Sequence, residues 1–168
     1  MEKELPKRKK IRIQGYDYSR AGVYFITICV KDMHELLGNM KVGAATCRPC
    51  VELSLEGQIT DNAIRNIHDI YPHVVVDKYV IMPNHVHLIL SVSDLKSGRQ
   101  IAAPTTVQTV IGNMKRYVSM QTGYSLWQKS FYDHIIRDEE DYQRIWQYID
   151  QNPARWQEDC YYKNKHLG

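Results

Sequence analysis

A chain of 168 residues is the size of one ordinary domain, long enough to bury about 70% of the surface that it exposes when unfolded. Its formal net charge is only +3, which gives weak support for a nucleic-acid partner. No apolar run approaches the length of a membrane span, and the Lys-rich N-terminus lacks the apolar segment of a signal peptide, so we expect a cytoplasmic protein without a membrane partner.

The N-terminal segment concentrates the positive charge that the rest of the chain lacks. Such a run is most often a solvated, disordered tail, but a basic arm can also contact phosphate groups when a nucleic acid is bound. We therefore separate a basic arm, residues 1–14, from a single domain, residues 15–168. The candidate nucleic-acid-binding residues are Lys7, Arg8, Lys9, Lys10 and Arg12 in the arm, with Lys115, Arg116, Lys129 and Arg137 in the domain.

The hydropathy pattern predicts strands and helices interspersed along the chain. In chain order we expect a strand at about 23–30, a short strand or hairpin within 38–54, a helix at 56–70, strands at 73–82 and 85–92, a polar connection at 93–104, a helix at 106–121, an edge strand at 132–136 and a last helix. Hairpin-like neighbours favour an α+β fold, with an antiparallel sheet and helices packed mainly on one face.

The strand expected at 85–92 places two histidines one residue apart. Side chains alternate between the faces of a strand, so His85 and His87 point the same way, about 7 Å apart along the chain, while Val86, Leu88 and Leu90 point into a core. A single histidine beside apolar residues is usually a packed core residue. Two buried imidazoles without partners would cost free energy, so the spacing favours a metal site that needs a third ligand.

The last helix carries start and stop signals at its two ends. Asp138 is a candidate N-cap, acidic residues fill the first turn, and Pro153 ends the helix at or just after Asn152. The helical spacing predicts that Tyr142, Ile145, Trp146 and Ile149 form its buried stripe. Tyr148 and Asn152 lie one turn apart on a flank of that stripe, from which both can reach a neighbouring sheet.

Four cysteines occur in the chain, and Cys47-Arg48-Pro49-Cys50 has the Cys-x-x-Cys spacing of some zinc and redox sites. A single such pair is weak evidence without a second pair of ligands, and the proline suits an ordinary turn. We therefore expect reduced thiols in a loop.

These motifs together resemble the REP-associated tyrosine transposases, the single-tyrosine members of the HUH endonuclease superfamily. The blocks that carry the resemblance follow the family's order and spacing. They are the opening segment and first strand at residues 11–18 and 22–29, the histidine motif at 82–87, a third block at 127–137, and the tyrosine motif at 148–153.

The resemblance implies a ferredoxin-like, RRM-related sheet, the HUH endonuclease fold. It implies that His85 and His87 bind a divalent metal, that Tyr148 is the catalytic nucleophile, and that Asn152 completes or supports the metal site. Imidazole with a carboxamide oxygen and open positions suits Mg²⁺ or Mn²⁺ better than a closed zinc site. No Gly-Lys-Ser/Thr phosphate-binding motif occurs, so we expect no nucleotide cofactor.

The implied activity is metal-dependent nicking and strand transfer through a 5′-phosphotyrosine intermediate on single-stranded, hairpin-forming, REP-like DNA. A cytoplasmic, nucleoid-associated monomer or homodimer is expected. Two alternatives stay open: a domesticated protein that binds hairpin DNA without mobilising it, and a metal-dependent nuclease in which water attacks in place of Tyr148.

Overall fold

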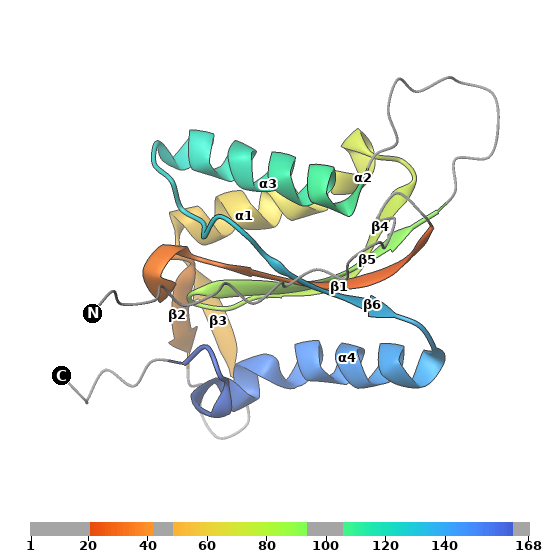
Figure 1. Ribbon diagram of the computed structural model, residues 1–168. Coiled ribbons are helices and arrows are strands. Elements are labelled where there is room, and N and C mark those ends of the chain that lie inside the picture. The colour runs from red at the N-terminus through yellow and green to blue at the C-terminus, as the bar shows by residue number, and fades with distance from the viewer. Residues whose placement is uncertain (1–20, 42–48, 94–105, 163–168) are drawn as a thin grey trace, which may run out of the picture.

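A four-stranded antiparallel sheet organises the computed structural model, which describes residues 21–41, 49–93 and 106–162 (Figure 1). Its strands are β1 (Gly22–Cys29), β4 (Val74–Ile81), β5 (His85–Val92) and β6 (Tyr132–Ile136), in the order β4-β5-β1-β6. The predicted strand at 85–92 is confirmed on a central position of the sheet, and the strand at 132–136 is confirmed at its edge. A separate two-stranded sheet pairs β2 (Gly38–Lys41) with β3 (Cys50–Leu53).

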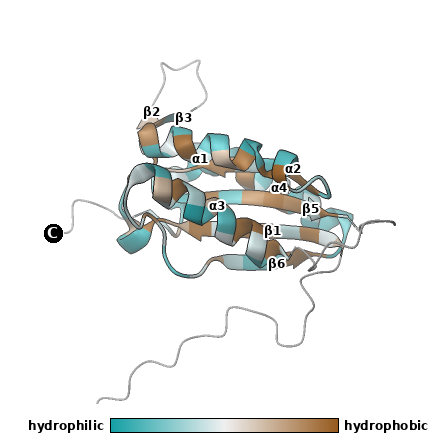
Figure 2. Ribbon diagram, turned by 90° about the horizontal axis from the view of Figure 1, so that it is seen from above, coloured by the Kyte–Doolittle hydropathy of each residue, from teal (hydrophilic) through white to brown (hydrophobic). Residues whose placement is uncertain are grey.

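The helices lie on both faces of the main sheet. On one face are α1 (Leu55–Arg65), α2 (Ile67–Ile70) and α3 (Val107–Thr122), and α1 and α3 run side by side (Figure 2). On the other face is α4 (Glu139–Gln151), and two 3₁₀ helices cover Lys31–Met33 and Asn152–Glu158. The α+β class with helices mainly on one face is thus confirmed. Within the described residues, no helix is both long and apolar enough to cross a membrane.

The single helix predicted at 56–70 is two helices in the structure, α1 and α2, because the backbone changes direction at Asn66. Ser54 caps the start of α1 because its hydroxyl accepts a hydrogen bond from the backbone N–H of Gly57. Asn66, with φ −80° and ψ −2°, ends α1 and precedes the short α2. The ψ angle near zero departs from α-helical values, so the chain turns there before Tyr71 and Pro72 lead into β4.

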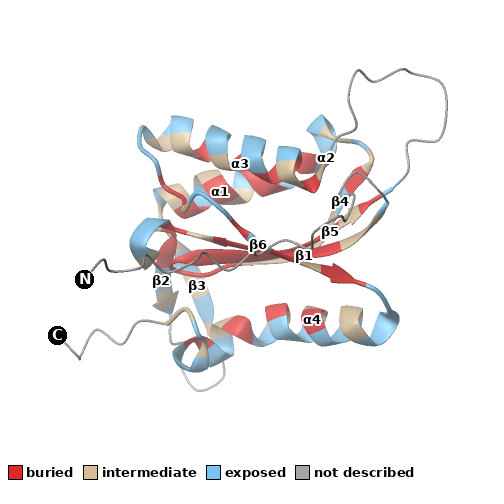
Figure 3. Cartoon of the chain, in the orientation of Figure 1, coloured by how far each residue is buried: buried red, intermediate tan, exposed pale blue. Residues whose placement is uncertain are grey.

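The residues of the main sheet are largely buried, as the burial colours show (Figure 3), and an apolar core lies on each of its two faces. The larger core lies between the sheet and α1–α3, and it contains Val86, Leu88 and Leu90, each fully buried as the alternation predicts. The smaller core lies under α4 and contains Phe25, Ile89, Ile136, Ile145 and Ile149.

Helix α4 forms and docks through the signals in its sequence. The side chain of Asp138 accepts a hydrogen bond from the N–H of Asp141, which confirms the predicted N-cap. The predicted stripe is confirmed as well, since Ile145 and Ile149 are buried and the two aromatic members pack partly buried against them. Lys78 of β4 pairs with Asp150 at 2.8 Å, which fixes the helix over β4 and β5.

Candidate active site

The two histidines of β5 lie on the α4 face of the sheet, as their spacing predicts. In the antiparallel register His85 is opposite Cys29 and His87 is opposite Thr27 of β1. The imidazole centroids are 4.4 Å apart, and the side chains are 0% and 1% exposed. The two imidazoles therefore lie side by side, shielded from solvent, at one end of the sheet.

A polar partner holds each imidazole by its Nδ1 atom. The side-chain oxygen of Asn84 lies 2.8 Å from Nδ1 of His85, and the hydroxyl of Thr27 lies 2.8 Å from Nδ1 of His87. A carboxamide oxygen can only accept, so Nδ1 of His85 carries the hydrogen and its Nε2 keeps a lone pair. Asn84 is itself held, because its Nδ2 donates to the carbonyl of Tyr161 at 2.9 Å. Partners of this kind orient imidazoles that bind metals.

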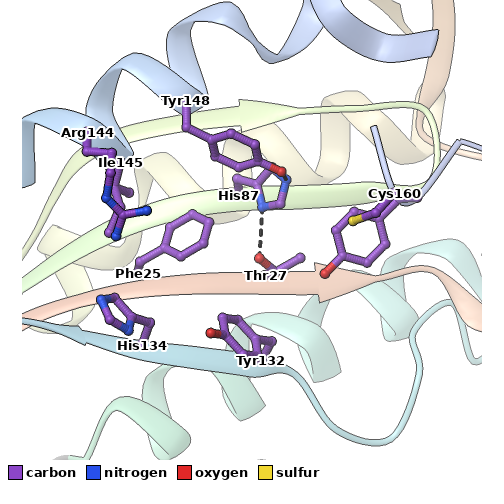
Figure 4. A pocket seen from close by; sticks show the side chains of 10 residues that line it. Phe25, Thr27, His87, Tyr132, His134, Arg144, Ile145, Tyr148 and Cys160 are labelled. Atoms are coloured by element: carbon purple, nitrogen blue, oxygen red, sulfur yellow. Dashed lines mark hydrogen bonds between the residues drawn. The ribbon is translucent and has the colours of Figure 1, made fainter. Parts of the chain in front are cut away.

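Tyr148 reaches this histidine pair from α4. Its hydroxyl lies 3.2 Å from Nε2 of His87 and 3.4 Å from a carboxylate oxygen of Asp159. The ring packs edge-on against Phe25 with a centroid separation of 6.1 Å, and the residue stays 41% exposed (Figure 4). The hydroxyl is thus next to the imidazoles while the side chain remains open to solvent.

Asn152 lies one helical turn after Tyr148 and is 3% exposed. Its Nδ2 donates to Asp159 at 2.7 Å, whereas its Oδ1 is buried without a hydrogen-bond partner among the described residues. The structure therefore brings together the four residues that the sequence singled out, His85, His87, Tyr148 and Asn152.

Asp159 belongs to the same group, although no sequence pattern predicted it. Ligand atoms of His85, His87 and Asp159 all lie within 4.8 Å of one another. Asp159 comes after the 3₁₀ helix that continues α4, outside any periodic pattern, and it is fixed there by the N–H of Tyr161 at 2.8 Å. The two histidines need a third ligand, and a carboxylate can provide one. The sequence alone does not distinguish Asp159 from the adjacent Glu158, which in the structure pairs with Arg155.

Burial keeps both imidazoles neutral. It lowers the pKa of His85 to about 4, with the charge of Asp159 acting in the opposite direction. Burial, with the neighbouring His85, also lowers the pKa of His87 well below its usual value. Neutral imidazoles are the form that binds metals, so no proton has to leave them at neutral pH.

The phenol of Tyr148 is shifted toward its protonated form. Burial is the largest cause of its raised pKa, followed by the negative charge of Asp159. Without a bound cation, the hydroxyl therefore stays protonated throughout the neutral range.

The donor set fits a divalent cation. Nε2 of His85 and Oδ1 of Asn152 are buried polar atoms that find no hydrogen-bond partner in the described part of the chain, and such atoms need an explanation in a folded protein. A cation bound by the two imidazoles and the carboxylate would supply one, and Asn152 would add an amide oxygen. Nitrogen and oxygen ligands of this kind are compatible with several divalent metals, Mn²⁺ among them.

An open cleft continues from the histidines along the sheet. It has a volume of about 500 Å³, with Phe25, Tyr132 and His134 as its floor and Arg144 and Tyr148 of α4 on one side (Figure 4). Helix α4 packs mainly over β4 and β5, and the cleft lies beside it, over Thr27 of β1 and Tyr132 and His134 of β6.

The candidate DNA-binding residues that the structure describes are not gathered at this site. The ammonium group of Lys115, on α3 and so on the opposite face, donates to the backbone carbonyls of Gln128, Lys129 and Ser130 at 2.7–3.4 Å. Arg116 is exposed on α3, and Arg137 is exposed between β6 and α4. The basic residues Lys7, Arg8, Lys9, Lys10 and Arg12, like Cys47, lie outside the described residues.

This chain is similar to known proteins in sequence and in fold. No protein-family model matches the chain. An uncharacterized protein of Haemophilus influenzae is 32% identical over 173 aligned residues, which cover 92% of this chain and 93% of that protein. A second protein of the same organism, named "putative REP-associated tyrosine transposase", is 24% identical, with 83% of this chain and 74% of that protein covered.

A solved structure of a REP-associated tyrosine transposase bound to a REP hairpin shares the fold. Its TM-score is 0.63 at 20% identity, with 86% of this chain and 74% of that chain covered. Sequence relatives that span most of both chains, the histidine and tyrosine motifs and this fold lead to one assignment: the chain belongs to the REP-associated tyrosine transposases.

Proposed function

We propose that this protein nicks single-stranded DNA and transfers the strand through a covalent 5′-phosphotyrosine on Tyr148. A divalent cation, Mg²⁺ or Mn²⁺, would be held by His85, His87 and Asp159, with Asn152 as a further ligand or a support. The observation that carries the proposal is the position of the Tyr148 hydroxyl, 3.2 Å from His87 and 3.4 Å from Asp159, beside three potential ligands and an open cleft.

The proposed substrate is DNA with a hairpin and flanking single strands. The related protein of the shared fold was solved bound to a REP hairpin, which supports hairpin DNA as the partner here. A scissile phosphate must lie in a single-stranded segment to enter a cleft of about 500 Å³, because a duplex is too wide for it.

The proposed reaction exchanges one phosphoester bond for another and does not hydrolyse it. The Tyr148 oxygen attacks the phosphorus atom, the bond from phosphorus to the 3′ oxygen breaks, and the departing 3′ oxygen takes up a proton. The 5′ phosphate stays on the tyrosine until a 3′-hydroxyl attacks it and releases the phenol. No ATP is required, since one phosphoester bond replaces another at each step.

Side chains of this site would prepare the nucleophile. The phenol proton needs an acceptor, and Asp159 Oδ2 lies 3.4 Å away. Asn152 holds that carboxylate through a 2.7 Å hydrogen bond, and Thr27 and Asn84 hold the imidazoles. A bound cation would withdraw charge from the non-bridging phosphate oxygens and favour the phenolate. In-line positioning is the remaining contribution of the site.

A denaturing gel tests the nucleophile. The protein is incubated with labelled hairpin DNA from the flanks of its own gene, in Mn²⁺ or Mg²⁺, as wild type and as Tyr148→Phe. We expect a covalent adduct with the wild type alone. Tyr142→Phe is the matched control, because Tyr142 is on the same helix but its hydroxyl donates to Asp77 at 3.3 Å. This variant should keep the adduct.

The other outcomes of the same gel separate the alternatives. Cleavage without an adduct in wild type and Tyr148→Phe alike would show that water is the nucleophile. Binding of the hairpin with neither cleavage nor adduct would support a domesticated DNA-binding protein. An adduct that survives Tyr148→Phe would overturn the assignment of the nucleophile.

A further inference from the structure

The floor of the cleft beyond the nucleophile is made of rings. In the sheet register Tyr132 of β6 is opposite Thr27, and His134 is opposite Phe25. Directly paired residues share a face, so these side chains lie on the same surface as the metal-site histidines (Figure 4). Because Tyr148 lines the same cleft, anything bound there lies beside the nucleophile.

Tyr132 exposes 47% of its surface on this floor. The edge strand holds the tyrosine ring in place, but the half of the ring that is exposed to solvent contributes little to the stability of the fold. Aromatic side chains on the open face of an RRM-type sheet stack with unpaired bases, and such stacking tolerates any base. The ring of Tyr132 is therefore a platform on which one base can stack.

A polar cluster borders this platform on the α4 side. Asp141 accepts a hydrogen bond from Nε2 of His134 at 2.6 Å and another from the guanidinium of Arg144. The Arg144 side chain is 71% exposed, and a guanidinium that serves one carboxylate has further N–H donors. The charge of Arg144 is largely balanced by Asp141, so the cluster suits the uncharged edge of a base better than a phosphate.

We propose that this cleft binds one unpaired base of the DNA strand next to the scissile phosphate, with the base stacked on Tyr132 and its edge hydrogen-bonded by Arg144. The inference rests on the proposed function, because Tyr148 marks where the phosphate lies. A volume of about 500 Å³ is within the roughly 300–1,000 Å³ of pockets that enclose small ligands. The cleft would thus select the position of the cut by the nucleotide beside it.

Binding measured without chemistry tests the subsite. In the Tyr148→Phe background, the probe is the hairpin from the gene's own flanks with single-stranded tails on both sides, and abasic sites replace the tail nucleotides one at a time. Fluorescence anisotropy at fixed salt gives each dissociation constant. We expect one tail position at which the missing base weakens binding by roughly five- to 150-fold.

Two changes at Tyr132 link that position to the cleft. Tyr132→Leu keeps an apolar side chain on the strand but removes the ring, so it should weaken binding of the intact probe and suffer no further loss from the abasic site. Tyr132→Phe should behave as the parent. The control is Tyr117→Leu, because Tyr117 is 45% exposed on α3, on the opposite face. It should keep the parent's abasic profile.

The base contact of Arg144 has its own readout. Arg144→Lys should reduce the preference among the four bases at the sensitive position, while the stacking contribution stays. The subsite is refuted if Tyr132→Leu binds as tightly as the parent or keeps the full abasic penalty. Those results would leave the proposed function intact, since the adduct formed by wild-type Tyr148 is scored in a separate gel.

Discussion

Replacing Thr27 by valine would remove the hydroxyl that contacts His87 while keeping the shape of the side chain. Thr27 is 2% exposed, and its hydroxyl lies 2.8 Å from Nδ1 of His87. In Thr27→Val, this nitrogen has no partner, and the ring loses the contact that directs Nε2 toward the proposed cation. The variant thus tests how much the orientation of this imidazole contributes to metal binding.

The structure sets two magnitudes for this change. A buried polar group without its partner costs about 1–3 kcal/mol, so the metal-free variant should unfold that much more easily. Loss of a residue that orients a metal-bound histidine weakens metal affinity by roughly 10–100-fold. At free Mn²⁺ about 100 times the wild-type dissociation constant, Mn²⁺ should stabilise the wild type by about 2.7 kcal/mol but the variant by only about 0.4–1.4 kcal/mol.

Urea unfolding with and without Mn²⁺ measures both effects. The matched control is Thr60→Val, because Thr60 is fully buried and its hydroxyl donates to the carbonyl of Glu56 within α1, away from the site. This control should keep the full stabilisation by Mn²⁺. If Thr27→Val is stabilised by Mn²⁺ as much as the wild type, Thr27 does not orient a metal ligand.

Three further changes test other parts of the structure. Asp159→Asn should weaken Mn²⁺ binding at least about tenfold in calorimetry, whereas Glu158→Gln, at the exposed neighbour, should not; equal affinities would remove Asp159 from the ligand set. The pKa of His85 is lowered to about 4 from 6.5, and that of His87 is lowered as well, so the unfolded chain binds more protons than the folded one in this window. The free energy of unfolding of the metal-free protein should therefore fall by at least about 3 kcal/mol as pH drops from 6.5 to 4; a flat profile in urea titrations would contradict the shifts. Gly57→Ala should destabilise the folded protein by more than about 1 kcal/mol, because the added methyl group would lie 2.0 Å from a backbone carbonyl oxygen. Gly112→Ala, where the added methyl group meets open space, should stabilise the folded protein by about 0.5–1 kcal/mol. Equal unfolding midpoints for the two variants would refute the comparison.

The residues that the sequence identified are those whose position follows from a local period. Alternation along β5 is enough to place His85 and His87 on one face and Leu88 on the other. The helical period likewise places Tyr148 and Asn152 on one flank of α4. Both inferences need only the geometry of a single element, and for that reason both agree with the structure.

Residues that depend on long-range register could not be found in this way. Thr27 contacts His87 only because β1 pairs with β5 in one particular register across 60 residues of sequence. Asp159 reaches the site because the chain turns after a 3₁₀ helix, and Arg144 faces the cleft because α4 crosses the sheet at one angle. No local pattern encodes a pairing register or a crossing angle, so these contacts need the folded chain.

The position of α4 relative to the sheet connects the two proposals. The helix contributes Tyr148 to the site and Arg144 to the cleft. It is held by the smaller apolar core and by Lys78 of β4, whose ammonium group pairs with Asp150 and lies 4.9 Å from the centre of the Trp146 ring. The larger core on the other face does not involve it. A change that shifts α4 should therefore alter cleavage and base selection together, whereas a change confined to Tyr132 alters base selection alone.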